Sequence, residues 1–247
     1  MAADPVKKTR RGRRVLLWLG LALLLTTAAF LLYAADYYRA DETALDALGS
    51  DGTVRVSRTD YGWFFDGPGE TRALIFYPGG KVEETAYAPL LRLLAEQGTD
   101  VCLVKMPLRL AVLAPDRADM VLAEHDYESW FIGGHSLGGA MAANYAAEHT
   151  ESLDGVILLA AYSTEPLPDS LPVLSVYGTE DGVLNRGNYE KNLANVPNLQ
   201  EVVIEGGNHA QFGSYGEQRG DGEASIDPGM QWNETAEAIL EFAGIGE

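Results

Sequence analysis

The sequence predicts an α/β protein, with a mostly parallel sheet covered by helices on both faces and one apolar helix before it. From about residue 53 onward, short apolar runs alternate with stretches of helical periodicity, which is typical of parallel strands buried on both faces. Residues 15–35 contain no charge. With 247 residues, of which 47% are hydrophobic, the chain has room for one globular domain of about 200 residues after that segment.

Residues 15–35 have the length and composition of a membrane-spanning helix. At ~1.5 Å per residue they reach about 30 Å, the thickness of a bilayer's hydrocarbon core. Six basic residues and one acid precede the segment, which places the N-terminus in the cytoplasm and the body across the membrane. We therefore expect a basic cytoplasmic tail at 1–14, a transmembrane signal anchor at 15–35 and a linker at 36–52. The alternative is a secretory signal that is cleaved near Ala35, leaving a secreted body.

The charge of the body excludes one class of partner. The net charge is −18, and residues 15–247 hold 12 basic against 35 acidic residues. Such a body repels phosphate, so we expect no nucleic-acid partner. The single cysteine, Cys102, cannot form an intrachain disulfide, and its apolar surroundings predict a buried strand position. No metal-ligand spacing or phosphate-binding loop is present, so we expect neither a metal nor a cofactor.

The elements of the body follow in order over residues 53–247. The predicted strands are 54–58, 73–77, 101–105, 130–132, 156–160, 173–177 and 199–204. The predicted helices are 85–96, 117–124, 137–148 and 234–242. Residues 213–229 are rich in glycine and acids without periodicity, which predicts a long loop, and the connection 160–173 is too short to hold a cap domain.

The strongest motif is Gly134-His135-Ser136-Leu137-Gly138. An apolar strand leads into this G-x-S-x-G pattern and a small-residue helix follows it, which is the strand–turn–helix context of a nucleophile elbow. The turn is so tight that both of its glycines are needed where a side chain would collide with backbone. Ser136 is therefore the candidate nucleophile. The alternative is a glycine-rich turn with an incidental serine.

A serine hydroxyl needs a base to take its proton, and four histidines are available. His135 would point away from its neighbour Ser136, His149 ends the elbow helix, and His125 lies in a polar stretch. His209 alone follows a late strand in a turn, where the backbone presents it at the carboxyl edge of the sheet. By elimination and position, His209 is the candidate base.

The acid of a triad is expected between the serine and the histidine in the chain. The strand 173–177 ends in Gly178-Thr179-Glu180-Asp181-Gly182, which places two carboxylates in a turn directly after a strand. Asp181 is preferred to Glu180, because the glycines beside the turn bring the shorter side chain within reach of the imidazole.

Two backbone N–H groups are expected to bind the oxyanion of a tetrahedral intermediate. The first belongs to Leu137, the residue after the nucleophile. The second belongs to the loop after the strand 73–77, where Gly80 is preferred to Gly79 by analogy with esterase motifs in which the residue after the glycine donates.

Five strings together resemble a known family: FYPGGKV, VKMPLRLAVL, GGHSLGGAMAA, YGTEDG and GNHAQFGSYGEQRGDG. Over residues 54–245 the chain is similar to the bacterial α/β-hydrolase-fold family 5, whose members are related to dienelactone hydrolases. The resemblance implies an α/β-hydrolase fold with Ser136, Asp181 and His209 as a catalytic triad. Dienelactone hydrolases carry a cysteine nucleophile, so the serine departs from their pattern, and the resemblance implies no particular substrate.

These features predict a membrane-anchored serine hydrolase that cleaves a carboxylic ester or related acyl bond of a small-molecule or lipid substrate. Acyl transfer to an acceptor other than water would use the same residues. A catalytically idle hydrolase fold that serves as a tethered binding module is the alternative from another class.

Overall fold

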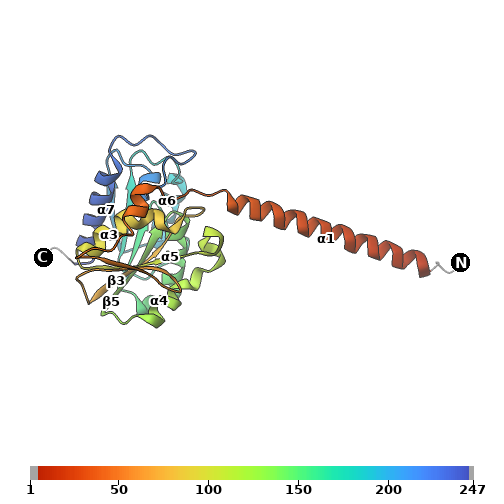
Figure 1. Ribbon diagram of the computed structural model, residues 1–247, viewed down its shortest axis with the longest axis horizontal. Helices are drawn as coiled ribbons and strands as arrows, with labels where there is room; N and C mark the ends of the chain where they lie inside the picture. Colours follow the sequence, from red (N-terminus) through yellow and green to blue (C-terminus); the bar gives the residue numbers. More distant parts are fainter. Residues whose placement is uncertain (1–4, 245–247) are drawn as a thin grey trace. The chain divides into compact units, whose positions relative to one another are not determined.

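The computed structural model describes residues 5–244, and these fall into two units (Figure 1). One ends at Tyr37 and the other begins at Tyr38. The first unit is the helix α1 (Pro5–Ala35), which includes residues 5–14 of the predicted basic tail, while residues 1–4 lie outside the described part. Its stretch Gly12–Ala35 is long and apolar enough to cross a membrane, a property that N-terminal signal sequences share.

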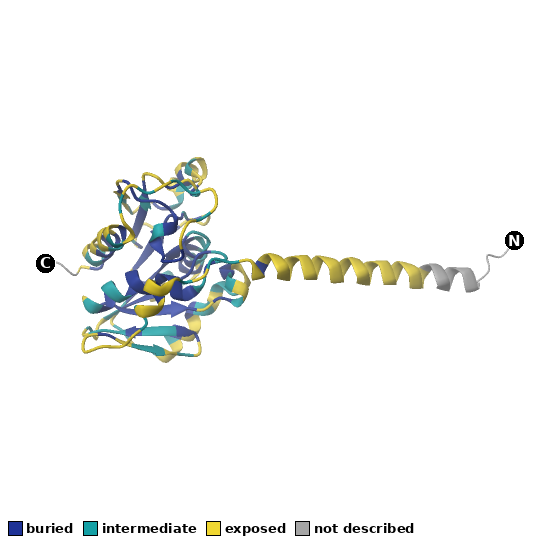
Figure 2. Cartoon of the chain, turned by 45° about the horizontal axis from the view of Figure 1, so that its top comes forward, coloured by how far each residue is buried: buried dark blue, intermediate teal, exposed yellow. Residues whose placement is uncertain are grey.

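The composition of α1 explains its form. Leucine and alanine, both good helix formers, dominate it, and Pro5 occupies the first position, where its missing N–H costs nothing. The hydroxyl of Thr26 donates to the carbonyls of Ala22 (3.0 Å) and Leu23 (2.9 Å), so this polar group is satisfied within the helix. Large apolar side chains from Val15 onward are exposed, and α1 thus presents an apolar surface (Figure 2).

The second unit is built on an eight-stranded sheet with the order β1-β2-β4-β3-β5-β6-β7-β8. Strand β2 is antiparallel to both of its neighbours, and all other neighbouring strands are parallel. This is the mostly parallel sheet that the sequence predicts. The strands are β1 (Arg55–Arg58), β2 (Gly62–Asp66), β3 (Arg72–Tyr77), β4 (Asp100–Val104), β5 (Ser129–His135), β6 (Gly155–Leu159), β7 (Val173–Gly178) and β8 (Leu199–Ile204).

Helices cover both faces of the sheet (Figure 1). Apolar residues of α3 and α7 join the core on one face, and those of α4 and α5 join the core on the other. Residues 160–172, which connect β6 to β7, contain neither helix nor strand, so no cap domain is inserted there. The helices of this unit are α2 (Glu42–Asp46), α3 (Ala88–Glu96), α4 (Ala118–Glu124), α5 (Leu137–Glu148), α6 (Arg186–Asn192) and α7 (Pro228–Phe242).

The two cores follow from the alternation of side chains along each strand. On β3, Leu74 and Phe76 face α3 and α7, whereas Ile75 and Tyr77 face α4 and α5. All four are fully buried, and Figure 2 shows the central strands buried as a block. Cys102 on β4 is buried as predicted, and burial raises the pKa of its thiol to about 12.

The sequence pattern does not predict β2 or α6. Strand β2 has the sequence GWFFD, in which two consecutive aromatics are half-buried, so it lacks the polar–apolar alternation of a surface strand. Helix α6 has a single buried side chain, that of Tyr189, and its other residues are polar or glycine. A local contact starts it, because the side chain of Asn185 accepts a hydrogen bond from the N–H of Asn188 (2.9 Å). Neither the strand nor the helix therefore has a periodic pattern by which the sequence alone would predict it.

Residues 38–52, expected as part of a linker, belong to the second unit. The N–H of Tyr38 donates to the carbonyl of Lys81 (2.8 Å), and its carbonyl accepts from the N–H of Glu83 (2.9 Å). Three residues further on, the N–H of Asp41 donates to the carbonyl of Ser214 (3.0 Å), whose hydroxyl donates to the Asp41 carboxylate (2.7 Å). Residues 38–41, which we call the stem, therefore join the loop after β3 to the loop that follows His209.

Candidate active site

Ser136 lies in a strained turn between β5 and α5. Its backbone has φ 52° and ψ −121°, a conformation that residues with a side chain rarely adopt. The N–H of Ser136 donates to the carbonyl of Leu159 on β6 (2.9 Å), which fixes the turn to the sheet. A Cβ on Gly134 or Gly138 would lie 2.4 or 2.2 Å from the carbonyl oxygen of Tyr77, so both positions require glycine, as the motif predicts.

Asp181 and His209 are hydrogen-bonded to each other. Nδ1 of His209 lies 2.9 Å from Oδ2 of Asp181, and both side chains are buried. The other oxygen, Oδ1, accepts from the N–H groups of Val183 (2.9 Å) and Leu184 (2.7 Å). The neighbouring Glu180 is exposed. Of the two turn carboxylates, Asp181 is thus the one in contact with the imidazole.

The electrostatics of Asp181 suit a carboxylate that remains ionised. Burial alone raises the pKa of its carboxyl group, but the hydrogen bond and charge of His209 and the two backbone donors outweigh burial. The net result is a pKa below the usual value. Asp181 therefore carries its negative charge at neutral pH, next to Nδ1 of His209.

Ser136 and His209 line the same pocket. It has a volume of about 390 Å³ and lies at the carboxyl ends of the parallel strands. Nε2 of His209 is buried and makes no hydrogen bond to any residue within 5–244, so no Ser136–His209 hydrogen bond is formed in this state. Catalytic hydrogen bonds in proteins without bound substrate are often long and shorten when the substrate binds. The remaining wall of the pocket is mainly apolar and includes Ala140, Met141, Ala160, Ala161, Val183 and Leu184.

The predicted oxyanion donors lie side by side. A Cβ on Gly80 would come within 2.9 Å of Cδ2 of Leu137, so the two residues adjoin. Leu137 is the first residue of α5, where backbone N–H groups have no partner within the helix, and the Ser136 side chain does not cap them. In contrast, the N–H of Gly79 donates to the hydroxyl of Tyr87 (3.0 Å), which favours Gly80 over Gly79 as a donor to substrate.

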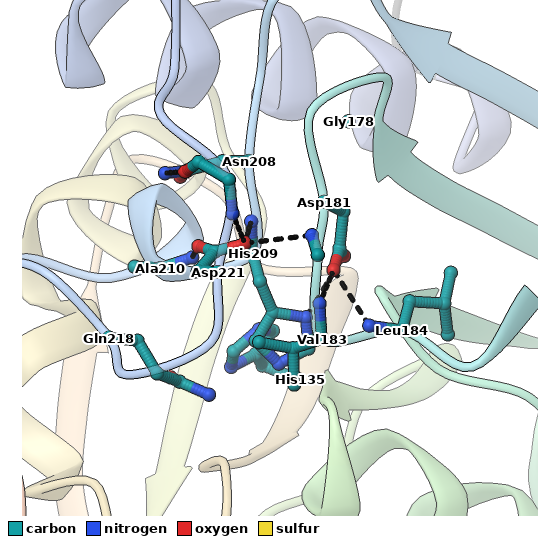
Figure 3. Close-up of polar contacts among 12 residues, drawn as sticks. His135, Gly178, Asp181, Val183, Leu184, Asn208, His209, Ala210, Gln218 and Asp221 are labelled. Atoms are coloured by element: carbon teal, nitrogen blue, oxygen red, sulfur yellow. Dashed lines mark hydrogen bonds and ion pairs between the residues drawn. The ribbon is translucent and has the colours of Figure 1, made fainter.

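The other histidines have different surroundings. His125 lies 2.9 Å from the Tyr61 hydroxyl, and His149 stacks on Tyr145 at the end of α5. His135 is buried, and its Nδ1 lies 2.8 Å from the hydroxyl of Tyr87. Its ring centroid lies 4.4 Å from that of His209 (Figure 3). Because the Tyr87 hydroxyl accepts from the N–H of Gly79, its own proton is available for Nδ1 of a neutral His135.

His135 makes stability depend on pH. Burial, and to a smaller extent the charge of His209, lowers the pKa of His135 well below its ordinary value. Below about pH 6.5 the unfolded chain therefore takes up a proton on His135 that the folded chain does not. We expect this group to reduce the free energy of unfolding by up to about 1.4 kcal/mol per pH unit as the pH falls below that value.

Thermal unfolding of the wild type and of His135→Gln between about pH 7.5 and pH 5.5 measures this effect. The Tm of His135→Gln should fall less over this range than the Tm of the wild type. An equal decrease in both proteins would show that His135 is protonated in the folded state or contributes nothing.

Asp221 makes contacts at the site that sequence patterns do not reveal. It lies in the long loop after His209, and its carboxylate accepts from the N–H groups of Gly182 (3.0 Å), His209 (3.2 Å) and Ala210 (2.8 Å) (Figure 3). The only signal in the sequence is the pair of glycines around it, which let the chain turn its carboxylate toward backbone. Within residues 5–244, no cluster of His, Cys, Asp and Glu side chains has a geometry that could hold a metal ion.

The sheet order, the elbow after β5 and the acid and histidine after β7 and β8 define a protein of the α/β-hydrolase type. A model of the alpha/beta hydrolase family matches residues 73–233, and the chain belongs to this family. The family resemblance of the sequence is thereby confirmed. None of the curated proteins compared with the chain matches its sequence.

Solved structures share the fold at low sequence identity. A membrane phospholipase A, described as a novel bacterial virulence factor, is 15% identical with a TM-score of 0.57, over 96% of this chain and 98% of its own. A carboxylesterase from Bacillus subtilis is 13% identical with a TM-score of 0.56, over 89% of this chain and 99% of its own. A dienelactone hydrolase from Anabaena variabilis is 15% identical with a TM-score of 0.54, and the match covers 76% of this chain and 98% of that protein.

Proposed function

We propose that the chain is a membrane-anchored serine hydrolase that cleaves carboxylic esters or related acyl bonds. The observation that carries the proposal is the buried His209–Asp181 pair (2.9 Å), whose histidine lines the same pocket as Ser136 in its strained turn. A nucleophile, a base and an acid that orients the base are the groups that acyl transfer through a covalent intermediate requires.

The residues act in two half-reactions. Oγ of Ser136 attacks the acyl carbon while Nε2 of His209 takes its proton, and Asp181 holds Nδ1 and stabilises the imidazolium. The N–H groups of Leu137 and Gly80 bind the oxyanion. His209 then protonates the departing alcohol, and the acyl group stays on Ser136. Water, activated by His209, releases the acid and restores the serine without a cofactor.

The wall of the pocket suggests the acyl group. Its side chains beside Ser136 are apolar, and a volume of about 390 Å³ at the surface accepts an alkyl chain better than a charged group. We therefore propose acyl groups with an apolar chain, from small esters or lipids. Hydrolysis of p-nitrophenyl esters of increasing chain length by the purified protein tests this. Activity on none of them, or only on charged acyl groups, would contradict it.

We further propose that α1 anchors the chain with its N-terminus in the cytoplasm and its body outside. The apolar stretch of α1 and the basic residues before it support this arrangement. The full chain should resist extraction by carbonate, and protease added to intact protoplasts should digest the body. A soluble form that begins near Asp36 would show instead that a signal is removed.

Two truncations separate anchoring from activity. A chain that starts at Asp36 should leave the membrane but keep most of its esterase activity, because the stem and both loops it joins remain. A chain that starts at Glu42 lacks Tyr38 and Asp41, so the loops that carry Gly80 and follow His209 lose their shared support. We expect turnover to fall at least tenfold in the second truncation relative to the first. Equal activity of the two would contradict a role of the stem.

A further inference from the structure

We propose that Asp221 is a positioning residue of the triad, which sets the distance between the catalytic acid and the catalytic base. This inference rests on the proposed serine hydrolase function. The observation behind it is that one carboxylate oxygen of Asp221 accepts hydrogen bonds from a backbone donor in each of the two catalytic loops. These donors are the N–H of Gly182, directly after Asp181, and the N–H of His209 itself.

The contacts of Asp221 link two loops that come from different strands. Oδ1 accepts from Gly182 (3.0 Å) in the loop after β7 and from His209 (3.2 Å) in the loop after β8. Oδ1 also accepts from Gly222 (2.9 Å), and Oδ2 accepts from Ala210 (2.8 Å). Figure 3 shows the carboxylate between the two chain segments. Four backbone donors are thus gathered on one side chain, and hydrogen bonds to an ionised acceptor are the stronger kind.

Close packing around Asp221 leaves this arrangement little freedom. A Cβ on Gly222 would lie 2.0 Å from the carbonyl oxygen of Glu180, and one on Gly182 would lie 2.7 Å from the carbonyl oxygen of Gly220. The Asn208 side chain donates to the carbonyl of Gly222 (2.8 Å), so the residue before His209 also holds this part of the loop. The backbone of 220–222 therefore lies directly against both catalytic loops.

Other hydrogen bonds between these loops lie further from the chemistry. The N–H of Glu180 donates to the carbonyl of Gly207 (2.9 Å), and the N–H of Gly206 donates to the hydroxyl of Thr179 (2.8 Å). These bonds hold the bases of the two loops together. Only the Asp221 carboxylate, among the described residues, bonds both the residue after Asp181 and His209. Its loss should leave the loops associated but allow the imidazole to shift relative to the pocket.

The test uses Asp221→Ala, Asp221→Asn and, as a control, Glu223→Ala. The alanine variant loses all four bonds, whereas the amide keeps one carbonyl oxygen that can face the same donors. A misplacement of about 1 Å costs on the order of 10²-fold in rate. We expect kcat for a p-nitrophenyl ester to fall by about that factor in Asp221→Ala and by less in Asp221→Asn, with KM nearly unchanged. Glu223 is exposed in the same loop, so Glu223→Ala removes the same charge and should retain wild-type kcat.

A second readout does not depend on turnover. The proton between Nδ1 of His209 and Asp181 should give a downfield NMR signal in the wild type and in Ser136→Ala. It should broaden or vanish in Asp221→Ala and persist in Glu223→Ala. Circular dichroism shows whether each variant folds. If Asp221→Ala does not fold, the kinetic constants and the NMR signal of Asp221→Asn decide.

The outcomes distinguish the two proposals. If Ser136→Ala abolishes turnover while both Asp221 variants keep wild-type kcat and the downfield signal, the positioning role is wrong and the hydrolase stands. If a folded Asp221 variant lowers kcat and raises KM by similar factors while the NMR signal stays intact, Asp221 acts on substrate binding and the positioning role is also wrong. If the wild type hydrolyses no ester, the proposed function fails, and the NMR comparison alone decides on Asp221.

Discussion

Ser136→Ala should lower kcat for ester hydrolysis by on the order of 10⁶ and leave the protein folded. The acyl-enzyme cannot form without Oγ, and the stabilised oxyanion then only assists direct attack by water. The Ser136 side chain does not cap the N-terminus of α5, so its removal takes no capping hydrogen bond from the folded state. Alanine also has the same Cβ in the same strained turn.

The measurement combines steady-state kinetics with thermal unfolding. The Tm should change by no more than a few degrees, as for a substitution without lost contacts. No neighbour in the chain can replace Oγ, because residues 133–140 of the elbow contain no hydroxyl group other than that of Ser136. If Ser136→Ala retained most of the wild-type turnover, another group would be the nucleophile and the mechanism would be wrong.

Asp181→Asn should lower kcat by on the order of 10⁴ with KM little altered. The amide keeps the shape of the side chain, and its carbonyl oxygen can face either the backbone donors of Val183 and Leu184 or His209. It cannot supply the negative charge that stabilises the imidazolium, and it favours the wrong tautomer of the ring. The chemical step therefore suffers, whereas ground-state binding of the substrate does not.

Glu180→Gln is the matched control for this variant. It removes one charge from the same turn, but Glu180 is exposed. Among the described residues, its carboxylate accepts a single, long hydrogen bond, from the Thr179 hydroxyl (3.4 Å). Screened electrostatics should change its turnover less than about tenfold. Equal losses in both variants would mean that the charge of the turn, and not a specific hydrogen bond, supports His209. A large loss only in Glu180→Gln would contradict the assignment of Asp181.

The sequence predicts the sheet because its central strands are buried on both faces. Strands β3 to β7 are mainly apolar and almost wholly buried. The glycines around Ser136 stand where a side chain would collide with backbone, so the order of residues at the end of β5 predicts the strand–turn–helix geometry. Strand β2 escapes prediction because its neighbours β1 and β4, and not its own periodicity, stabilise it. Helix α6 escapes prediction because only its N-cap and one buried tyrosine mark it. The stem is missed for the same reason as β2, since its bonds to residues 81–83 and 214 connect parts of the chain that are distant in sequence.

The candidate site is predicted where local geometry defines it. A residue directly after a parallel strand lies at the carboxyl edge of the sheet, which is enough to bring His209 and Asp181 together. Asp221 could not be predicted in this way. It lies in a loop without periodicity, and its role depends on backbone N–H groups, which are present at every residue except proline and leave no pattern in a sequence.

Covalent labelling by a fluorophosphonate tests the central claim most directly. The probe mimics an acyl donor, and its phosphonyl group remains on an activated serine. The purified wild type should carry one adduct, which peptide mass spectrometry should map to Ser136. The adduct should be absent in Ser136→Ala and form far more slowly in His209→Gln. A folded wild type that takes up no probe, or that takes it up on another residue, would contradict a serine hydrolase and favour a tethered binding module.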